Sequence, residues 1–167
     1  MLGYVCKYTP MELFEAMDTE ITRLEPSVTD FNHADTLMHA NICSYTKAVL
    51  EDVMEHDYEG VILTTCCDSI RRLYDTLKSQ FPDKFFFLLD IPRKFNDFAV
   101  ALYERQLKQM LTEYEAFSGK TLDLKRFVSM MQNKAALKKQ ENTRMSSNQL
   151  LFSYSITFCA LPSTTTT

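Results

Sequence analysis

The sequence has few of the residues on which the common nucleotide-binding and catalytic motifs depend. Its three glycines, Gly3, Gly60 and Gly119, lie too far apart for a G-x-G-x-x-G or a Walker A loop. Its three histidines show no H-E-x-x-H spacing, and no serine stands in a G-x-S-x-G motif. These absences exclude nucleotide loops of both kinds and leave zinc-protease and serine-hydrolase functions without their usual residues.

The chain also lacks an excess of positive charge. Its formal net charge is -4 and its pI is about 5.4, whereas nucleic acids and anionic membranes attract basic surfaces. The amino terminus shows no secretory signal, and no apolar run reaches the ~20 residues that span a bilayer. We therefore expect a cytoplasmic protein that binds neither nucleic acid nor membrane.

Strand and helix patterns alternate along the first half of the chain. With 167 residues, of which 46% are hydrophobic, the chain is long enough for one domain with a sizeable core. Short apolar runs predict strands over residues 2–6, 20–24, 60–65 and 84–90, and helical spacing predicts helices over 10–18, 44–57 and 70–81. This alternation predicts an α/β domain of the three-layer Rossmann-like or flavodoxin-like kind, with a small parallel sheet and helices on both faces.

Beyond Pro92 the sequence predicts long helices in place of further strands. Apolar residues recur at helical spacing from Phe98 to Phe117, ahead of Gly119, and a second helical pattern covers residues 124–144. From residue 146 onward the chain contains no Asp, Glu, Lys or Arg and ends in four threonines. We therefore divide the chain into a domain of residues 1–145 and an atypical, disordered tail of residues 146–167.

Several polar and aromatic residues have structural explanations. Thr9 and Glu12 are spaced as a capping box, and Asp68 and Ser69 are expected to cap a later helix. His39 is expected in an exposed loop. Three tyrosines near the cysteines are expected to pack in the core: Tyr4, Tyr8 and Tyr45.

The five cysteines form no regular disulfide framework, so core packing, metal binding and reactive thiols are the roles to weigh. Cys6 follows the first predicted strand, Cys66 and Cys67 follow the third, and Cys43 directly precedes a helix. The carboxyl ends of parallel strands share one edge of the sheet, where α/β proteins bind their ligands. These cysteines are expected to share that edge.

Three of these thiols are the expected ligands of an iron–sulfur cluster. Helix amino termini favour the thiolate, which is the form that binds metal. Because adjacent Cys66 and Cys67 project in different directions, we expect one of them, preferably Cys67, to join Cys6 and Cys43 while Cys66 packs. Three thiolates suit a cubane with one open iron site. Cys159 in the tail is not an expected ligand. The alternative is that the cysteines are core residues, as free cysteine often is.

Short blocks around these cysteines resemble the 2-hydroxyacyl-CoA dehydratase family, the D-component-like iron–sulfur proteins that also include benzoyl-CoA reductase subunits and double-cubane cluster proteins. The blocks are Gly3-Tyr-Val-Cys-Lys-Tyr-Thr-Pro10 with Glu12-Leu13, Asn41-Ile-Cys-Ser-Tyr45 with Lys47, Thr65-Cys-Cys-Asp-Ser-Ile-Arg-Arg72, and Leu89-Asp-Ile-Pro92. Together with Gly119 and Asn142-Thr-Arg144 they extend the resemblance over residues 1–145.

The resemblance implies that Cys6, Cys43 and Cys67 hold a [4Fe-4S] cluster, single or of the double-cubane type, with one iron open to water or substrate. It implies an anaerobic lyase or a related low-potential reductase that acts on an acyl-CoA. In the dehydratases one electron passes from the cluster to the thioester carbonyl, and the resulting ketyl radical expels the neighbouring hydroxyl group. An ATP-dependent activator iron–sulfur protein supplies the electron, and a partner subunit in a homo- or heterodimer is expected.

Two departures from the family pattern limit what is carried over. Asp18-Thr19 stands where the family has a glycine-containing turn, and the family pattern stops after the first of two similar α/β domains. We therefore expect a truncated form that lacks substrate contacts and is inactive alone. The alternative functions are a non-enzymatic α/β interaction module with packed cysteines and, third, a zinc or thiol-redox protein.

Overall fold

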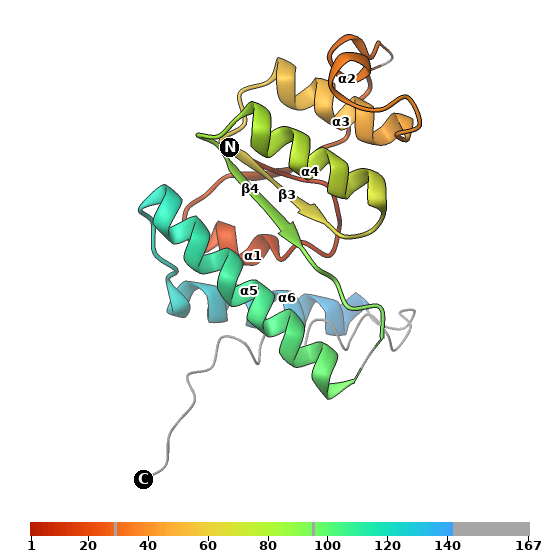
Figure 1. The fold of residues 1–167 in the computed structure, drawn as a ribbon. Helices are drawn as coiled ribbons and strands as arrows, with labels where there is room; N and C mark the ends of the chain where they lie inside the picture. The colour runs from red at the N-terminus through yellow and green to blue at the C-terminus, as the bar shows by residue number, and fades with distance from the viewer. Residues whose placement is uncertain (29, 95, 142–167) are drawn as a thin grey trace. The chain divides into compact units, whose positions relative to one another are not determined.

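The computed structural model describes residues 1–28, 30–94 and 96–141 (Figure 1). The described residues form two compact units, one made of Met1–Thr9 and Thr19–Arg93 and the other of Pro10–Asp18 and the described residues from Lys94 onward. The predicted tail of residues 146–167, its Cys159 and the boundary at residue 145 lie outside the described residues. None of the helices described has both the length and the apolar character needed to span a membrane.

The first unit is built on a sheet of four parallel strands in the order β2-β1-β3-β4. Its strands are β1 (Leu2–Tyr4), β2 (Ile21–Arg23), β3 (Gly60–Thr64) and β4 (Phe85–Leu89). The chain leaves β1 toward one edge of the sheet and leaves β3 toward the other edge, so the topological switch point lies between β1 and β3. The predicted α/β class and small parallel sheet are confirmed, and β2 is an edge strand as expected.

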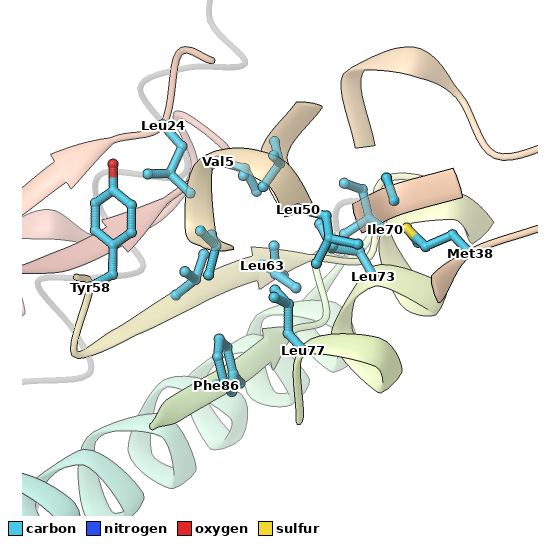
Figure 2. Close-up of a cluster of buried hydrophobic side chains, with 14 residues drawn as sticks. Val5, Leu24, Met38, Leu50, Tyr58, Leu63, Ile70, Leu73, Leu77 and Phe86 are labelled. Carbon is cyan, nitrogen blue, oxygen red and sulfur yellow. The ribbon is translucent and has the colours of Figure 1, made fainter. Parts of the chain in front are cut away.

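Helices α3 (Ser44–Glu55) and α4 (Asp68–Gln80) share one apolar core with the sheet. Buried residues recur every three or four positions along each helix, which brings them to one side of it. Figure 2 shows Leu63 of β3 together with Leu73 and Leu77 of α4. The buried cluster consists of Val5, Leu24, Ala34, Met38, Val49, Leu50, Val53, Tyr58, Val61, Leu63, Ile70, Leu73, Leu77 and Phe86.

Gly60 allows β3 and β4 to approach each other closely. A Cβ atom at this position would lie 2.0 Å from the backbone oxygen of Phe85, a distance that no real contact tolerates. Gly60 is paired with Phe85 at the start of the β3–β4 ladder. The glycine is therefore required by the backbone packing of the sheet.

Helix α2 (Asn32–Leu37) is attached to α3 by a buried carboxylate. Glu51 accepts a hydrogen bond of 2.8 Å from the Ala34 N–H, and its second oxygen lies 2.7 Å from His33 Nδ1. Burial raises the pKa of Glu51, but the hydrogen bonds from Ala34 and His33 outweigh burial and bring this pKa below its usual value. The charged form of Glu51 therefore joins the two helices.

The second unit contains α1 (Met11–Glu15), α5 (Asp97–Ser118) and α6 (Leu124–Glu141). Phe14 of α1 and Tyr114 of α5 pack edge to face, with ring centroids 5.1 Å apart. Lys134 Nζ of α6 lies 3.1 Å from the Glu12 carboxylate of α1. Both predicted long helices are confirmed within the described residues.

Helix α5 ends as predicted, but part of its predicted apolar face is exposed. Gly119 ends the helix in the left-handed conformation, with φ of 69°, which glycine adopts without strain. Phe98 is 78% exposed and Phe117 is 44% exposed. Phe98 directly precedes the first buried residue of the helix, and Phe117 lies in its last turn. The stripe consists of Ala99, Tyr103, Leu107, Met110 and Tyr114.

The predicted capping box at the start of α1 is wrong. The helix begins one residue later than expected, with Pro10 as its N-cap residue and no side-chain cap, and it ends at Glu15 instead of near Asp18. The Thr9 N–H is engaged in a turn, where it donates to the Cys6 carbonyl at 2.9 Å. Glu12 cannot complete the box because its carboxylate is paired with Lys134.

Candidate cysteine site at the carboxyl edge of the sheet

The three predicted ligands all belong to elements of the first unit. Cys6 is half-buried and lies two residues beyond the end of β1. Cys67 is exposed and is the N-cap residue of α4, in the connection that follows β3. Cys43 is exposed and is the N-cap residue of α3. Their predicted positions at strand ends and helix starts are confirmed, whereas their role as ligands stays a prediction.

Cys43 has surroundings that favour a thiolate. Its Sγ lies 3.0 Å from the Thr46 hydroxyl. Partial burial raises the pKa of Cys43, but hydrogen bonds from the side chain and backbone of Thr46, from the Ser69 side chain and from the Tyr45 backbone outweigh it. The pKa of Cys43 is therefore below that of an ordinary thiol, as expected at a helix amino terminus.

Cys66 has the opposite electrostatic character. Burial raises the pKa of this thiol, and its neighbours Cys67 and Cys6 raise it further. Each neighbouring thiolate would repel a negative charge on Cys66, so the thiolate form of Cys66 is disfavoured. The expected packing role of Cys66 is wrong because the side chain is exposed. The Cys66 N–H donates a hydrogen bond of 2.7 Å to the Thr64 carbonyl. The chain leaves the sheet at this turn.

Tyr45 lies at the same edge, although the sequence had suggested a packing role. The Tyr45 side chain is 44% exposed, so that prediction is wrong. Burial raises the pKa of its phenol, Arg23 lowers it, and Cys66 and Cys6 raise it. Tyr45 is therefore close to two of the thiols. Its position two residues after Cys43 was the signal available in the sequence.

The remaining predictions for individual polar and aromatic residues have mixed outcomes. Tyr4 is buried and packs as expected, whereas Tyr8 is 41% exposed. His39 is exposed, as predicted. Asp68 and Ser69 lie in the first turn of α4 and do not cap it, because the N-cap residue is Cys67.

An acidic side chain that the sequence analysis missed lies at the end of β4. Asp90 accepts a hydrogen bond of 2.5 Å from the Thr65 hydroxyl, which joins the carboxyl ends of β3 and β4. The Ile91 N–H donates to the same hydroxyl at 3.4 Å. This link fixes the backbone just before Cys66 and Cys67.

Thr64 provides a structural test of whether an iron–sulfur cluster suits this edge. Thr64 is fully buried, and its Oγ1 has no hydrogen-bond partner among the described residues. The β1–β3 ladder ends with the pair Tyr4 and Ile62, so Cys6 and Thr64 each follow this last pair by two residues, toward the carboxyl ends of the strands. A buried hydroxyl without a partner is costly, and a sulfur acceptor at this place would satisfy it.

The sulfurs are not arranged around a single metal ion. Within the described ranges, no three His, Cys, Asp or Glu side chains form a group that would hold one ion. A cluster requires a different arrangement of ligands, because each cysteine binds a separate iron. Accessible thiols on three segments and a buried hydroxyl without a partner at the carboxyl end of β3 fit such a group in the chemistry of the donors.

Fold and site together define a parallel α/β protein with a cysteine-rich switch point. A family model described as "2-hydroxyglutaryl-CoA dehydratase, D-component" matches residues 6–161 of the chain. The chain therefore belongs to this family, and the resemblance inferred from the sequence is confirmed. No curated protein matches the chain. The family match extends beyond residue 145 into the segment that the sequence analysis separated as a tail.

Proposed function

We propose that this chain is the iron–sulfur component of a 2-hydroxyacyl-CoA dehydratase-like enzyme, with Cys6, Cys43 and Cys67 as cluster ligands. Family membership supports the dehydratase-like assignment. The observation that carries the cluster assignment is the position of these cysteines at the ends of β1 and β3 and at the start of α3, beside the switch point.

Cys67 is the better ligand of the adjacent pair. As the N-cap residue of α4 it lies at the positive end of a helix, where a thiolate is stabilised. The thiol of Cys66, in contrast, has a raised pKa because of burial and of its neighbours Cys67 and Cys6. Binding through Cys67 leaves Cys66 protonated and avoids a further negative charge.

The cluster, of the [4Fe-4S] or double-cubane type, would supply single low-potential electrons for the reduction of an acyl-CoA thioester before water is eliminated. The residues of this chain hold the cluster and set its surroundings. The positive charge of Arg23 lowers the pKa of Tyr45, so a cation and a phenol of this edge influence each other. We include an ATP-dependent activator protein, an acyl-CoA substrate and a partner subunit in the proposal because the family resemblance implies them.

The test is metal analysis of the whole chain purified without oxygen. We expect brown protein that contains iron and acid-labile sulfide in similar amounts, with an electron paramagnetic resonance signal after reduction. Colourless protein that holds only zinc, or no metal, would overturn the cluster assignment. Zinc alone would favour a zinc or thiol-redox protein, and absence of metal would favour an interaction module.

A further inference from the structure

Thr46 is a buried polar residue whose hydroxyl faces a sulfur. The residue is fully buried in the first turn of α3, and its Oγ1 lies 3.0 Å from Cys43 Sγ. Burying a hydroxyl is unfavourable unless it forms a hydrogen bond. Cys43 provides that bond, so the two side chains hold each other in place.

A second hydroxyl reaches the same sulfur from another helix. The Ser69 side chain, in the first turn of α4, helps to lower the pKa of Cys43. The backbone N–H groups of Tyr45 and Thr46 add to it from the start of α3. Helices α3 and α4 pack against each other in the core of the unit, which keeps these donors together. Cys43 therefore has fixed donors on two helices.

We propose that Thr46 is a positioning residue for Cys43, and that its hydroxyl, assisted by Ser69, orients Sγ toward the cluster and raises the reduction potential of the cluster. This inference rests on the proposed function. A hydrogen bond to a ligand sulfur withdraws electron density from the cluster and so favours its reduced, more negative state. Neither residue touches the substrate in this role.

The direction and size of the effect follow from the loss of one donor. Thr46→Val keeps the shape of the side chain and removes the hydroxyl, so the cluster should become harder to reduce. The hydrogen bond is stronger to the more negative, reduced cluster, and only this difference between the two oxidation states shifts the potential. We expect a shift of roughly tenfold in the ratio of reduced to oxidised cluster at a fixed potential, which is about 59 mV for one electron.

The experiment is a redox titration of the cluster in the full chain, followed by absorbance and electron paramagnetic resonance. Thr46→Val and Ser69→Ala should each shift the potential to a more negative value, and Thr46→Ser, which keeps a hydroxyl, should restore it. Thr76→Val is the matched control, because Thr76 of α4 donates only to the Arg72 carbonyl of its own helix at 2.9 Å. This control should leave the potential unchanged.

The outcomes separate this inference from the proposed function. Wild-type protein without a cluster overturns both. A cluster whose potential is the same in wild type, Thr46→Val and Ser69→Ala overturns the role of Thr46 and leaves the proposed function standing. If the Thr46→Val variant is folded but does not retain the cluster, and the Thr46→Ser variant does retain it, cluster retention supports the positioning role. If Thr46→Val keeps the cluster at an unchanged potential while Thr46→Ser loses it, the packing of the methyl group and not the hydroxyl is responsible, and the proposal is wrong.

Discussion

Single residues at the carboxyl edge differ in how readily they lose a proton, although all carry the same functional group. Cys43 receives hydrogen bonds that favour its thiolate. The thiolate of Cys66, in contrast, is disfavoured by burial and by the neighbouring sulfurs. The difference arises from a few neighbours within hydrogen-bond or short electrostatic range, since a thiol in water has no such preference. The surroundings of Cys43 and Cys66 therefore give two thiols of the same edge opposite tendencies to ionise.

Substitution of the cysteines tests the proposed ligands. We expect Cys6→Ala, Cys43→Ala and Cys67→Ala each to abolish cluster retention, because each removes one of three ligands, and Cys66→Ala to retain the cluster. The measurement is iron and sulfide per chain after anaerobic reconstitution, with far-ultraviolet circular dichroism as the check on folding. Loss of the cluster in Cys66→Ala, with Cys67→Ala unaffected, would assign the ligand to the other sulfur of the pair.

Gly60 tests the close approach of β3 and β4. Gly60→Ala should destabilise the fold by roughly 3 kcal/mol, because the added Cβ overlaps the Phe85 carbonyl and the strands must move apart. Chemical denaturation measures this change in the free energy of unfolding. Gly119→Asn is the contrast, since asparagine tolerates a positive φ and no atom lies within 4 Å of the new Cβ. Equal stability of Gly60→Ala and wild type would show that the strands are not held this closely.

At the scale of elements, α2 depends on α3 for its attachment. Apolar packing of Ala34 and Met38 joins the hydrogen bonds made by Glu51. A helix of six residues is too short to be stable by itself in water, so it needs such contacts. Ionisation of Glu51 is therefore linked to the order of α2.

The pKa of Glu51 gives this link a pH dependence. Because its pKa is lower in the folded chain than in the unfolded one, the charged form stabilises the fold above the unfolded pKa. That stabilisation is lost as the pH falls through the folded pKa. Glu51→Gln should cost about 2 kcal/mol at neutral pH and progressively less in acid.

Urea unfolding of wild type and Glu51→Gln over a series of pH values measures this dependence. Glu55→Gln is the matched control, because Glu55 is exposed on the same helix and should leave stability nearly unchanged. A difference between wild type and Glu51→Gln that does not decrease in acid would mean that the charge of Glu51 does not attach α2.

At the scale of the whole molecule, the proposed ligands come from segments far apart in the chain, around residues 6, 43 and 67. A cluster that binds all three is bound only by the folded chain, so binding and folding are coupled. The sheet brings two of these segments to adjacent strand ends, and the start of α3 supplies the third.

Removal of iron should therefore lower the thermal stability of the whole chain. If binding stabilises the fold by about 3 kcal/mol, chelation should reduce Tm by roughly 6 to 12 °C. Differential scanning calorimetry without oxygen measures the shift before and after chelation. Cys43→Ala should show no response to the chelator. An unchanged Tm for wild type that has lost its iron would contradict the coupling.

Much of the local structure could be predicted because its signals are local. The apolar run after Lys84 predicted β4, and Pro82 after the spaced residues of α4 predicted where that helix ends. The start of α3 followed from the same patterns, so the position of Cys43 directly before that helix was predicted correctly, whereas α4 begins at Asp68, two residues earlier than predicted. The family was recognised because its blocks surround these cysteines.

Other features could not be predicted because they depend on partners distant in the sequence. Glu12 does not have the capping role that was predicted, and its carboxylate is instead paired with Lys134 of α6. Tyr45 was expected to pack, but the same edge of the sheet also holds Cys6 and Cys66. An aromatic residue in a sequence does not show whether its ring faces the core or the site.

The sequence by itself determined the alternation of strands and helices, the helix starts beside the cysteines and the family to which the chain belongs. These depend on hydrophobic periodicity and short motifs, which act over a few residues. Only the tertiary structure decided the strand order β2-β1-β3-β4, the contact of Gly60 with Phe85, and the burial of the Thr64 hydroxyl without a partner among the described residues. Parallel strands pair across long connections, so their order depends on which apolar faces are buried together and not on the residues of any one strand.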